Sequence, residues 1–255
     1  MENNQFVGKV LYSFDELPST NDWASELIAK SAPPEGTVVK SAVQTAGRGQ
    51  FGSTWQSAAG QNLLFSVVLY PVWLRISEQF ELSMAVALAL FDTAKRHVPN
   101  ADWRIKWPND LYVADQKAAG ILIQNSITGQ HIQSSIVGIG LNVNQLEFDA
   151  SLPNPASMAS VTGNLFHLDS VFSDLCAAIE LRYLQLQSVD RKNIKTQYES
   201  ALYQKDKVSR FEALGNSALF NGIIRGVGPE GRLRVETSEG LRDFDLKEVR
   251  LVISA

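Results

Sequence analysis

Apolar residues recur along this chain in two periods, one typical of helices and the other typical of strands. Four large apolar residues follow one another at spacings of four and three: Phe80, Met84, Leu88 and Phe91. This spacing predicts an amphipathic helix. We expect Ser77 to cap its start, with Glu78 and Glu81 in the first turn, where carboxylates favour the positive end of the helix dipole.

Strands are predicted where β-branched and apolar residues run together without helical spacing. The candidates before the C-terminal region are residues 7–14, 37–43, 62–70, 103–107, 120–124 and 135–143. The run 62–70 (NLLFSVVLY) is almost continuously apolar, which indicates a strand covered on both faces. Further helices are expected over 21–30, which starts behind Ser19-Thr20, and over about 170–186.

From Val208 onward the pattern changes to short β-runs separated by turn clusters. These runs cover residues 219–227, 232–237 and 241–246, which is typical of a small barrel. A piece of roughly 50 residues has a marginal core, so we expect it to dock against the rest of the chain. The predicted class is therefore α+β, with a larger mixed β-sheet domain flanked by helices over 1–200 and a small all-β barrel over 201–255.

Composition and charge narrow the class of protein. Hydrophobic residues make up 45% of the chain and charged residues 20%, which is ordinary globular usage. The net charge of −4 argues against a dedicated nucleic-acid binder, and no apolar run reaches the ~18 residues of a membrane-spanning helix. The single cysteine, Cys176, lies in an apolar helical stretch, so we expect a buried thiol and a cytoplasmic protein.

A glycine-rich loop over residues 44–60 carries the first candidate chemistry. Gly47-Arg48-Gly49-Gln50-Phe51-Gly52 matches G-x-G-x-x-G, which is a weak signal alone. A dinucleotide-binding motif of this form needs a helix after the third glycine, and a kinase phosphate loop needs an H-R-D segment elsewhere. The sequence shows neither. Closely spaced glycines still let backbone N–H groups approach an anion, and Arg48 adds donors suited to a carboxylate or phosphate. We expect this loop to be mobile until ligand binds.

Three further segments combine polar groups with glycine at strand ends. They are Lys106-Trp107-Pro108-Asn109-Asp110, Lys117-Ala118-Ala119-Gly120-Ile121-Leu122 and Gly138-Ile139-Gly140-Leu141-Asn142-Val143-Asn144. Each has an ordinary structural interpretation: a packed turn, a surface lysine and a kinked strand, respectively. Glycines within a strand pattern also permit the close approach of a ligand.

The ordered set of motifs closely resembles that of the biotin protein ligases over nearly the whole chain. The set is Ser19-Thr20-Asn21, Gln44-Thr45-Ala46-Gly47-Arg48-Gly49, Trp55 and the three segments named above. The resemblance implies two steps, in which biotin and ATP form biotinyl-adenylate and a lysine of a carrier protein then takes the biotinyl group. The resemblance also implies a protein partner, the biotin carboxyl carrier domain of a biotin-dependent carboxylase. It further suggests a homodimer, the commonest symmetric assembly of soluble proteins.

The resemblance also implies roles for individual residues. Biotin would be bound by Ser19, Thr20, Asn21, Gln44, Gly47, Arg48, Gly49, Gln50, Trp55, Lys117 and Gly120. ATP would be bound by Arg48, Lys106, Trp107, Asn109, Lys117 and Asn142. Lys117 and Arg48 would stabilise charge that builds up during catalysis, and Asp110 would either bind magnesium or help the incoming amine lose its proton.

The chain departs from the family pattern in its loop and is expected to differ in DNA binding. Gln50 and Phe51 occupy positions where the family usually has an arginine and a polar residue, which predicts weaker retention of the adenylate. Only residues 1–18 precede the Ser19 motif, so we expect no helix-turn-helix and no operator binding. Two alternatives remain open: a lipoate ligase, disfavoured by the K-W-P-N-D segment, and a non-catalytic biotin or nucleotide sensor.

Overall fold

The chain forms two β-sheets in the computed structural model, which describes residues 4–253. The larger sheet has seven strands in the order β1-β2-β3-β7-β6-β5-β4. Their bounds are β1 Leu11–Leu17, β2 Val38–Gln44, β3 Leu63–Leu69, β4 Trp103–Lys106, β5 Asp110–Val113, β6 Gln116–Thr128 and β7 His131–Leu141. Strands β1 and β2 run parallel and the other neighbours antiparallel, so the sheet is mixed, as the sequence predicts.

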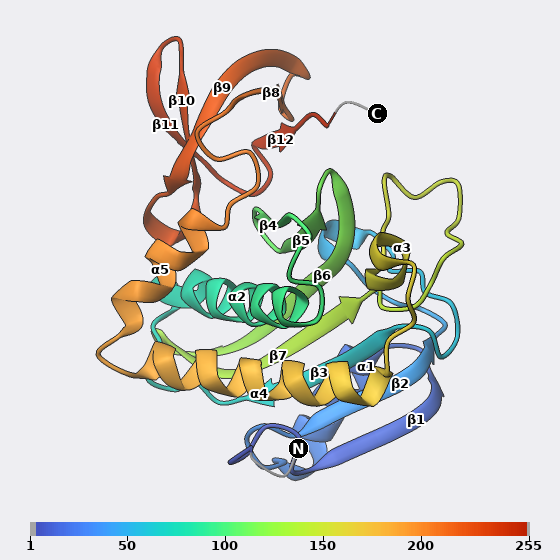
Figure 1. Cartoon of the computed structure of the whole chain (residues 1–255). Coiled ribbons are helices and arrows are strands. Elements are labelled where there is room, and N and C mark those ends of the chain that lie inside the picture. Colours follow the sequence, from blue (N-terminus) through green and yellow to red (C-terminus); the bar gives the residue numbers. More distant parts are fainter. Residues whose placement is uncertain (1–3, 254–255) are drawn as a thin grey trace.

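Helices cover both faces of this sheet. Helices α2 (Gln79–His97) and α4 (Leu168–Gln187) pack together on one face, where Phe65 and Val67 of β3 enter the main core (Figure 1). Helix α1 (Thr20–Ser31) lies on the other face, against Val68 of β3. Successive β3 residues alternate between these faces and all are buried, which explains the unbroken apolar run.

The predicted helix starts are right for α1 and wrong for α2. Ser19 caps α1 by accepting a hydrogen bond from the Asp22 N–H at 3.3 Å. Ser77 caps nothing, because a 3₁₀ turn, η2 (Ile76–Glu78), precedes α2, and its N-cap, Glu78, makes no side-chain cap bond. The Glu78 carboxylate instead accepts the Arg75 N–H at 3.2 Å, so the two residues fix the turn that leads into the helix.

The first predicted strand is displaced. Residues 7–14 were the expected range, but β1 begins at Leu11. The reason is the buried carboxylate of Glu180 on α4, which accepts hydrogen bonds from the backbone N–H groups of Gln5, Phe6 and Val7 at 2.7 to 2.8 Å. Those donors are therefore committed to α4. Besides the 3₁₀ turns, the sequence pattern misses five short elements among the described residues. They are β5, α3 (Met158–Thr162), α5 (Arg191–Ser200), β8 (Val208–Ala213) and β12 (Val249–Leu251).

The C-terminal region forms the second sheet, a five-stranded antiparallel one with the order β11-β10-β9-β8-β12. The strands are β8 Val208–Ala213, β9 Ala218–Val227, β10 Leu233–Thr237, β11 Gly240–Phe244 and β12 Val249–Leu251, with the 3₁₀ turn η3 over Pro229–Gly231. This sheet docks on the larger unit as expected, because Trp107 donates its indole N–H to the Gly231 carbonyl at 2.8 Å. The predicted α+β class is confirmed.

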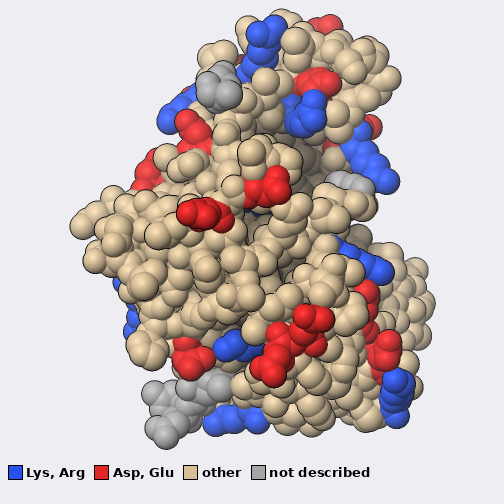
Figure 2. Space-filling model, turned by 90° about the vertical axis from the view of Figure 1, so that its right-hand side faces the viewer, with Lys and Arg blue, Asp and Glu red and all other residues tan. Residues whose placement is uncertain are grey.

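The structure also bears on the expectations about membrane-spanning helices and about Cys176. Within residues 4–253, no helix is long and apolar enough to cross a membrane. Cys176 is fully buried in α4, and that burial raises the pKa of its thiol to about 12. Acidic and basic side chains are interspersed over the face that Figure 2 shows.

Candidate active site

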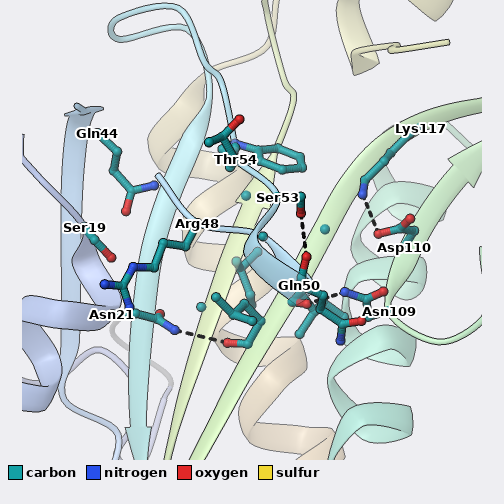
Figure 3. A pocket seen from close by; sticks show the side chains of 18 of the residues that line it. Ser19, Asn21, Gln44, Arg48, Gln50, Ser53, Thr54, Asn109, Asp110 and Lys117 are labelled. Atoms are coloured by element: carbon teal, nitrogen blue, oxygen red, sulfur yellow. Dashed lines mark hydrogen bonds and ion pairs between the residues drawn. The ribbon is translucent and has the colours of Figure 1, made fainter. Parts of the chain in front are cut away.

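A cavity of about 530 Å³ lies on the α1 side of the larger sheet. Its lining includes most of the residues that the motifs single out: Ser19, Thr20, Asn21, Gln44, Arg48, Gly49, Gln50, Trp55, Lys106, Asn109, Asp110, Lys117 and Gly120. Five further lining residues belong to the same motifs but had no assigned role: Ile121, Leu122, Gly138, Ile139 and Gly140. The structure adds Ser53, Thr54 and Arg250. Figure 3 shows Ser19, Asn21, Gln44 and Arg48 on one side and Asp110 and Lys117 on the other. The volume suits a small organic ligand.

Two glycines of β7 make room for this cavity. The strand register places Gly138 between Ser66 and Leu122, and Gly140 lies two residues further along the same face. A Cβ added at Gly138 would lie 2.2 Å from Asn21 Oδ1, and one at Gly140 would lie 2.4 Å from the Trp55 ring. The strand runs unbroken through both positions, so their glycines serve close approach rather than a kink.

One end of the cavity is lined by neutral polar groups held in a hydrogen-bond network. The Thr20 N–H and hydroxyl donate to Gln44 Oε1 at 2.8 and 3.1 Å. Ser66 Oγ lies 2.7 Å from Thr20 Oγ1 and 2.6 Å from Asn21 Oδ1, and the Asn21 amide donates to Gln124 Oε1 at 3.0 Å. These contacts fix the orientation of amide and hydroxyl groups that face the cavity.

The sequence motifs miss two members of this network, Gln124 and Ser66, and Ser66 lies at its centre. The Ser66 side chain is fully buried at the centre of β3, where every neighbouring strand residue is apolar. A buried hydroxyl needs a hydrogen-bond partner, so a lone serine within an apolar run is itself a signal. That signal indicates a polar group on the adjoining layer, here the start of α1.

The glycine-rich loop folds back over the cavity as a short antiparallel turn. Arg48 and Thr54 form an isolated antiparallel β-bridge, and the Trp55 N–H donates to the Gly47 carbonyl at 3.0 Å. The Arg48 guanidinium makes an ion pair with Asp22 of α1 at 3.1 Å. The side chain of Phe51 lies outside what the structure describes, and the mobility expected of this loop stays a prediction.

The opposite end of the cavity carries charge. Lys106 and Asp110 are directly paired across the β4–β5 hairpin, and Lys117 Nζ lies 2.6 Å from Asp110 Oδ1. Burial lowers the pKa of Lys106, and the neighbouring charges of Lys117 and Arg250 lower it further, while Asp110 opposes the change. Cations therefore outnumber the carboxylate here, which favours an anionic ligand.

A bulge in β6 determines where Lys117 points. The register of β5 against β6 skips Ala118, so Lys117 and Gly120, three residues apart, face the same cavity instead of opposite sides of the sheet. Lys117 is then held from both sides, because its N–H donates to the Asn154 carbonyl at 2.7 Å and its carbonyl accepts the Ala156 N–H at 2.9 Å. The predicted strand 120–124 is thus extended on both sides, to Gln116–Thr128.

Three of the residues assigned to biotin or ATP lie outside the cavity lining: Gly47, Trp107 and Asn142. Trp107 faces the C-terminal sheet through its bond to Gly231. Asn142 is buried and donates to the Ala156 carbonyl at 3.0 Å, so it supports the segment that holds Lys117. Among the described residues, Asn142 Oδ1 and the buried Trp55 Nε1 have no hydrogen-bond partner.

The donor set does not make a resident metal site. In the part of the chain that the structure describes, no group of three or more His, Cys, Asp or Glu residues could hold an ion. Asp110 is the sole acidic side chain in the described lining, and Lys117 already neutralises it. A magnesium ion in this cavity would therefore take most of its ligands from phosphate groups and water.

Known proteins are similar to this chain in both sequence and fold. The sequence model of the biotin/lipoate A/B protein ligase family matches residues 13–142. The bifunctional ligase/repressor BirA of Bacillus subtilis is 31% identical over 97% of this chain and 75% of its own length. The biotin–[acetyl-CoA-carboxylase] ligase of Mycobacterium tuberculosis is 27% identical over 86% of this chain and 81% of its own length.

Among solved structures, the biotin protein ligase of Aquifex aeolicus, in complex with biotin and ATP, superposes with a TM-score of 0.80 at 24% identity. That comparison covers 96% of this chain and all of the other, so both sheets are part of the shared fold. Together with the sequence matches, it places the motif-bearing cavity in a known architecture. The chain belongs to the biotin/lipoate A/B protein ligase family.

Proposed function

We propose that this protein is a biotin protein ligase, which activates biotin as biotinyl-5′-adenylate and transfers the biotinyl group to a lysine of a biotin carboxyl carrier protein. The observation that carries the proposal is the division of one cavity into a neutral polar end and a cationic end. Biotin joined to a nucleotide phosphate has the same division, with a ureido ring at one end and anionic groups at the other.

The neutral end suits the ureido ring, which needs both donors and acceptors. Ser19, Thr20, Asn21 and Gln44 supply hydroxyl and amide groups, and the Ser66 network holds them in place. Trp55 supplies an apolar wall above Gly140 and carries an indole N–H that lacks a protein partner among the described residues. These groups favour biotin over lipoate, whose dithiolane ring offers no N–H groups.

The cationic end suits the adenylating step. The biotin carboxylate attacks the α-phosphorus of ATP, a bond to phosphorus forms, and the bond to the leaving pyrophosphate breaks. We assign Lys117 to the charge that develops on the α-phosphate oxygens, since a donor held in place before the reaction stabilises the transition state most. Arg48, on the loop at the opposite side of the cavity (Figure 3), contributes to the same charge once the ligand is bound. Arg48 must then exchange its ion pair with Asp22 for the ligand.

In the transfer step, the acceptor lysine attacks the acyl carbonyl and AMP leaves. Its ammonium must first lose a proton, and Asp110 is the cavity carboxylate able to accept it. Before that step, Asp110 holds the Lys117 ammonium through their 2.6 Å ion pair. Magnesium enters as part of the ATP substrate.

The decisive experiment is intact-mass spectrometry of a biotin carboxyl carrier domain incubated with this protein, ATP, magnesium and either biotin or lipoate. We expect one biotinyl adduct with biotin, none with lipoate, and none for Lys117→Ala. Lys95→Ala is the matched control, because Lys95 lies on α2 and outside the cavity lining. Biotin binding without any adduct would instead support a biotin sensor, and a lipoyl adduct would support a lipoate ligase.

A further inference from the structure

The loop between β4 and β5 joins the two charged residues that face each other at the cationic end of the cavity. Lys106 ends β4 and pairs directly with Asp110, which begins β5, so residues 107–109 alone connect them. The geometry of so short a loop fixes how the two strand ends meet. The position of the Asp110 carboxylate, beside Lys117 in Figure 3, therefore depends on what holds residues 107–109 in place.

Each residue of this loop bonds to a different part of the fold. The Trp107 indole binds the turn η3 beside the C-terminal sheet, and the Asn109 side-chain amide donates to the Ile121 carbonyl of β6 at 2.6 Å. The Pro108 carbonyl accepts a hydrogen bond at 3.2 Å from the hydroxyl of Tyr198 on α5. Trp107 and Asn109 belong to a motif, whereas nothing in the local sequence marks Tyr198 as part of the site.

The surrounding core holds the Tyr198 side chain in one place. Tyr198 and Ile194, one helical turn apart, are the buried residues of α5, and Tyr198 has none of its surface exposed. Its ring meets the Phe80 ring of α2 edge-on, with 5.8 Å between the ring centroids. At the start of α5, Arg191 pairs with Glu78 at 2.9 Å, which fixes this helix to the start of α2. The hydroxyl therefore reaches the loop from a packed side chain with a fixed direction.

The Tyr198 hydroxyl acts as a hydrogen-bond donor. Burial raises the pKa of Tyr198, and the negative charge of Asp110 raises it further, so the hydroxyl keeps its proton at neutral pH. A carbonyl oxygen only accepts hydrogen bonds, so this proton must point at Pro108. Tyr198 does not line the cavity and cannot contact a ligand bound there. Any effect of its hydroxyl on the reaction must therefore pass through the loop.

We propose that Tyr198 is a positioning residue for the transfer step, because its bond to the Pro108 carbonyl fixes the loop that sets the Asp110 carboxylate. In the proposed mechanism Asp110 accepts a proton from the acceptor ammonium, and such a transfer requires the two heavy atoms to lie within hydrogen-bond reach. A loop that lacks the Tyr198 bond is free to tilt, and it brings Asp110 within that reach less often. This inference rests on the proposed ligase function.

The adenylating step depends less on this loop. Lys117, which we assign to that step, is held by its own backbone bonds to Asn154 and Ala156. Its remaining link to the loop is the ion pair with Asp110, which runs through a long side chain that can follow a small shift of the carboxylate. The neutral end of the cavity makes no bond to residues 107–109 in the described network. We therefore expect adenylate formation and biotin binding to change much less than transfer.

The test measures the two steps separately in wild type and in Tyr198→Phe, which loses the hydroxyl and keeps the ring. Transfer is followed in single turnovers from supplied biotinyl-5′-adenylate to a carrier domain, and adenylate formation is followed as pyrophosphate release at saturating biotin and ATP. Tyr198→Phe should slow transfer by about 3- to 10-fold, as for the loss of one uncharged hydrogen bond. Adenylate formation should change much less, and the Kd for biotin should stay the same.

The pH dependence of transfer separates the positioning of Asp110 from a general loosening of the fold. An ordinary lysine has a pKa of about 10.4, so raising the pH from neutral gives a growing fraction of acceptor amine that is already deprotonated. Transfer then depends less on Asp110, and the deficit of Tyr198→Phe should shrink as the pH rises. A merely structural loss would give the same deficit at every pH.

Tyr70→Phe is the matched control. The Tyr70 hydroxyl also donates to a proline carbonyl, that of Pro33 at 2.9 Å, and Tyr70 does not line the active-site cavity. This variant should lose a similar amount of thermal stability, because it removes the same kind of hydrogen bond. It should nevertheless keep both steps at the wild-type rate.

An unchanged transfer rate for Tyr198→Phe, or a deficit that is constant with pH, would overturn the inference while leaving the ligase function standing. Equal losses in both steps, or an equal loss of transfer in Tyr70→Phe, would also overturn it. A wild-type protein that transfers no biotinyl group to the carrier domain would refute the ligase function, and this inference with it.

Discussion

Gly138→Ala tests whether the neutral end of the cavity depends on close contact between α1 and the sheet. The added Cβ would lie 2.2 Å from Asn21 Oδ1, so Asn21 must move by about 1.2 Å to reach an ordinary contact of 3.4 Å. That shift disturbs the bonds from Ser66 at 2.6 Å and to Gln124 at 3.0 Å. At about 1 kcal/mol each, with overpacking added, we expect unfolding to become easier by about 2 to 4 kcal/mol.

The same displacement should weaken biotin binding. Loss of one or two oriented hydrogen bonds corresponds to a Kd raised by about 10- to 100-fold. Calorimetric titration with biotin and thermal unfolding measure the two effects. The control is Gly215→Ala, because a Cβ at Gly215 meets no atom within 4 Å. Wild-type affinity for biotin in Gly138→Ala would refute the assignment of this end of the cavity to the ureido ring.

Four more outcomes follow from individual residues. Gln50→Arg should reduce labelling of a bystander protein, because a second loop arginine retains the adenylate; equal labelling contradicts this. Cys176 should react slowly with iodoacetamide at mildly alkaline pH in the native protein and rapidly in urea, since burial raises its thiol pKa to about 12. Burial lowers the pKa of Lys106, so this lysine loses its charge at a lower pH than an ordinary lysine does. As the pH is raised, the KM for ATP should therefore begin to increase at a lower pH in wild type than in Lys106→Arg. Superimposable pH profiles of the KM would argue against contact between Lys106 and the nucleotide. Glu180→Gln should lower the free energy of unfolding in urea by about 1 to 3 kcal/mol, because a carboxylate that accepts three backbone N–H groups becomes neutral; Glu26→Gln, on the exposed face of α1, should have a much smaller effect.

Local signals in the sequence determined a large part of this protein. The spacing of apolar residues located α2, an apolar helical stretch located α4, and the cap at Ser19 located the start of α1. These signals involve residues that are close in the chain. The glycine-rich loop and the segment from Lys106 to Asp110 could likewise be recognised locally, because each combines polar or charged side chains with turn-forming residues. Twelve of the residues assigned to biotin or ATP line one cavity, together with Asp110.

Only the tertiary structure decided the features that depend on contacts between distant segments. Glu180 draws residues 5–7 away from β1, and Ser66 becomes a site residue because α1 lies over β3. Arg250 reaches the cavity because a separate sheet docks through Trp107, the same contact that takes Trp107 out of the lining. Such partners lie more than 40 positions apart, and no local pattern specifies which distant group will satisfy a buried donor or acceptor.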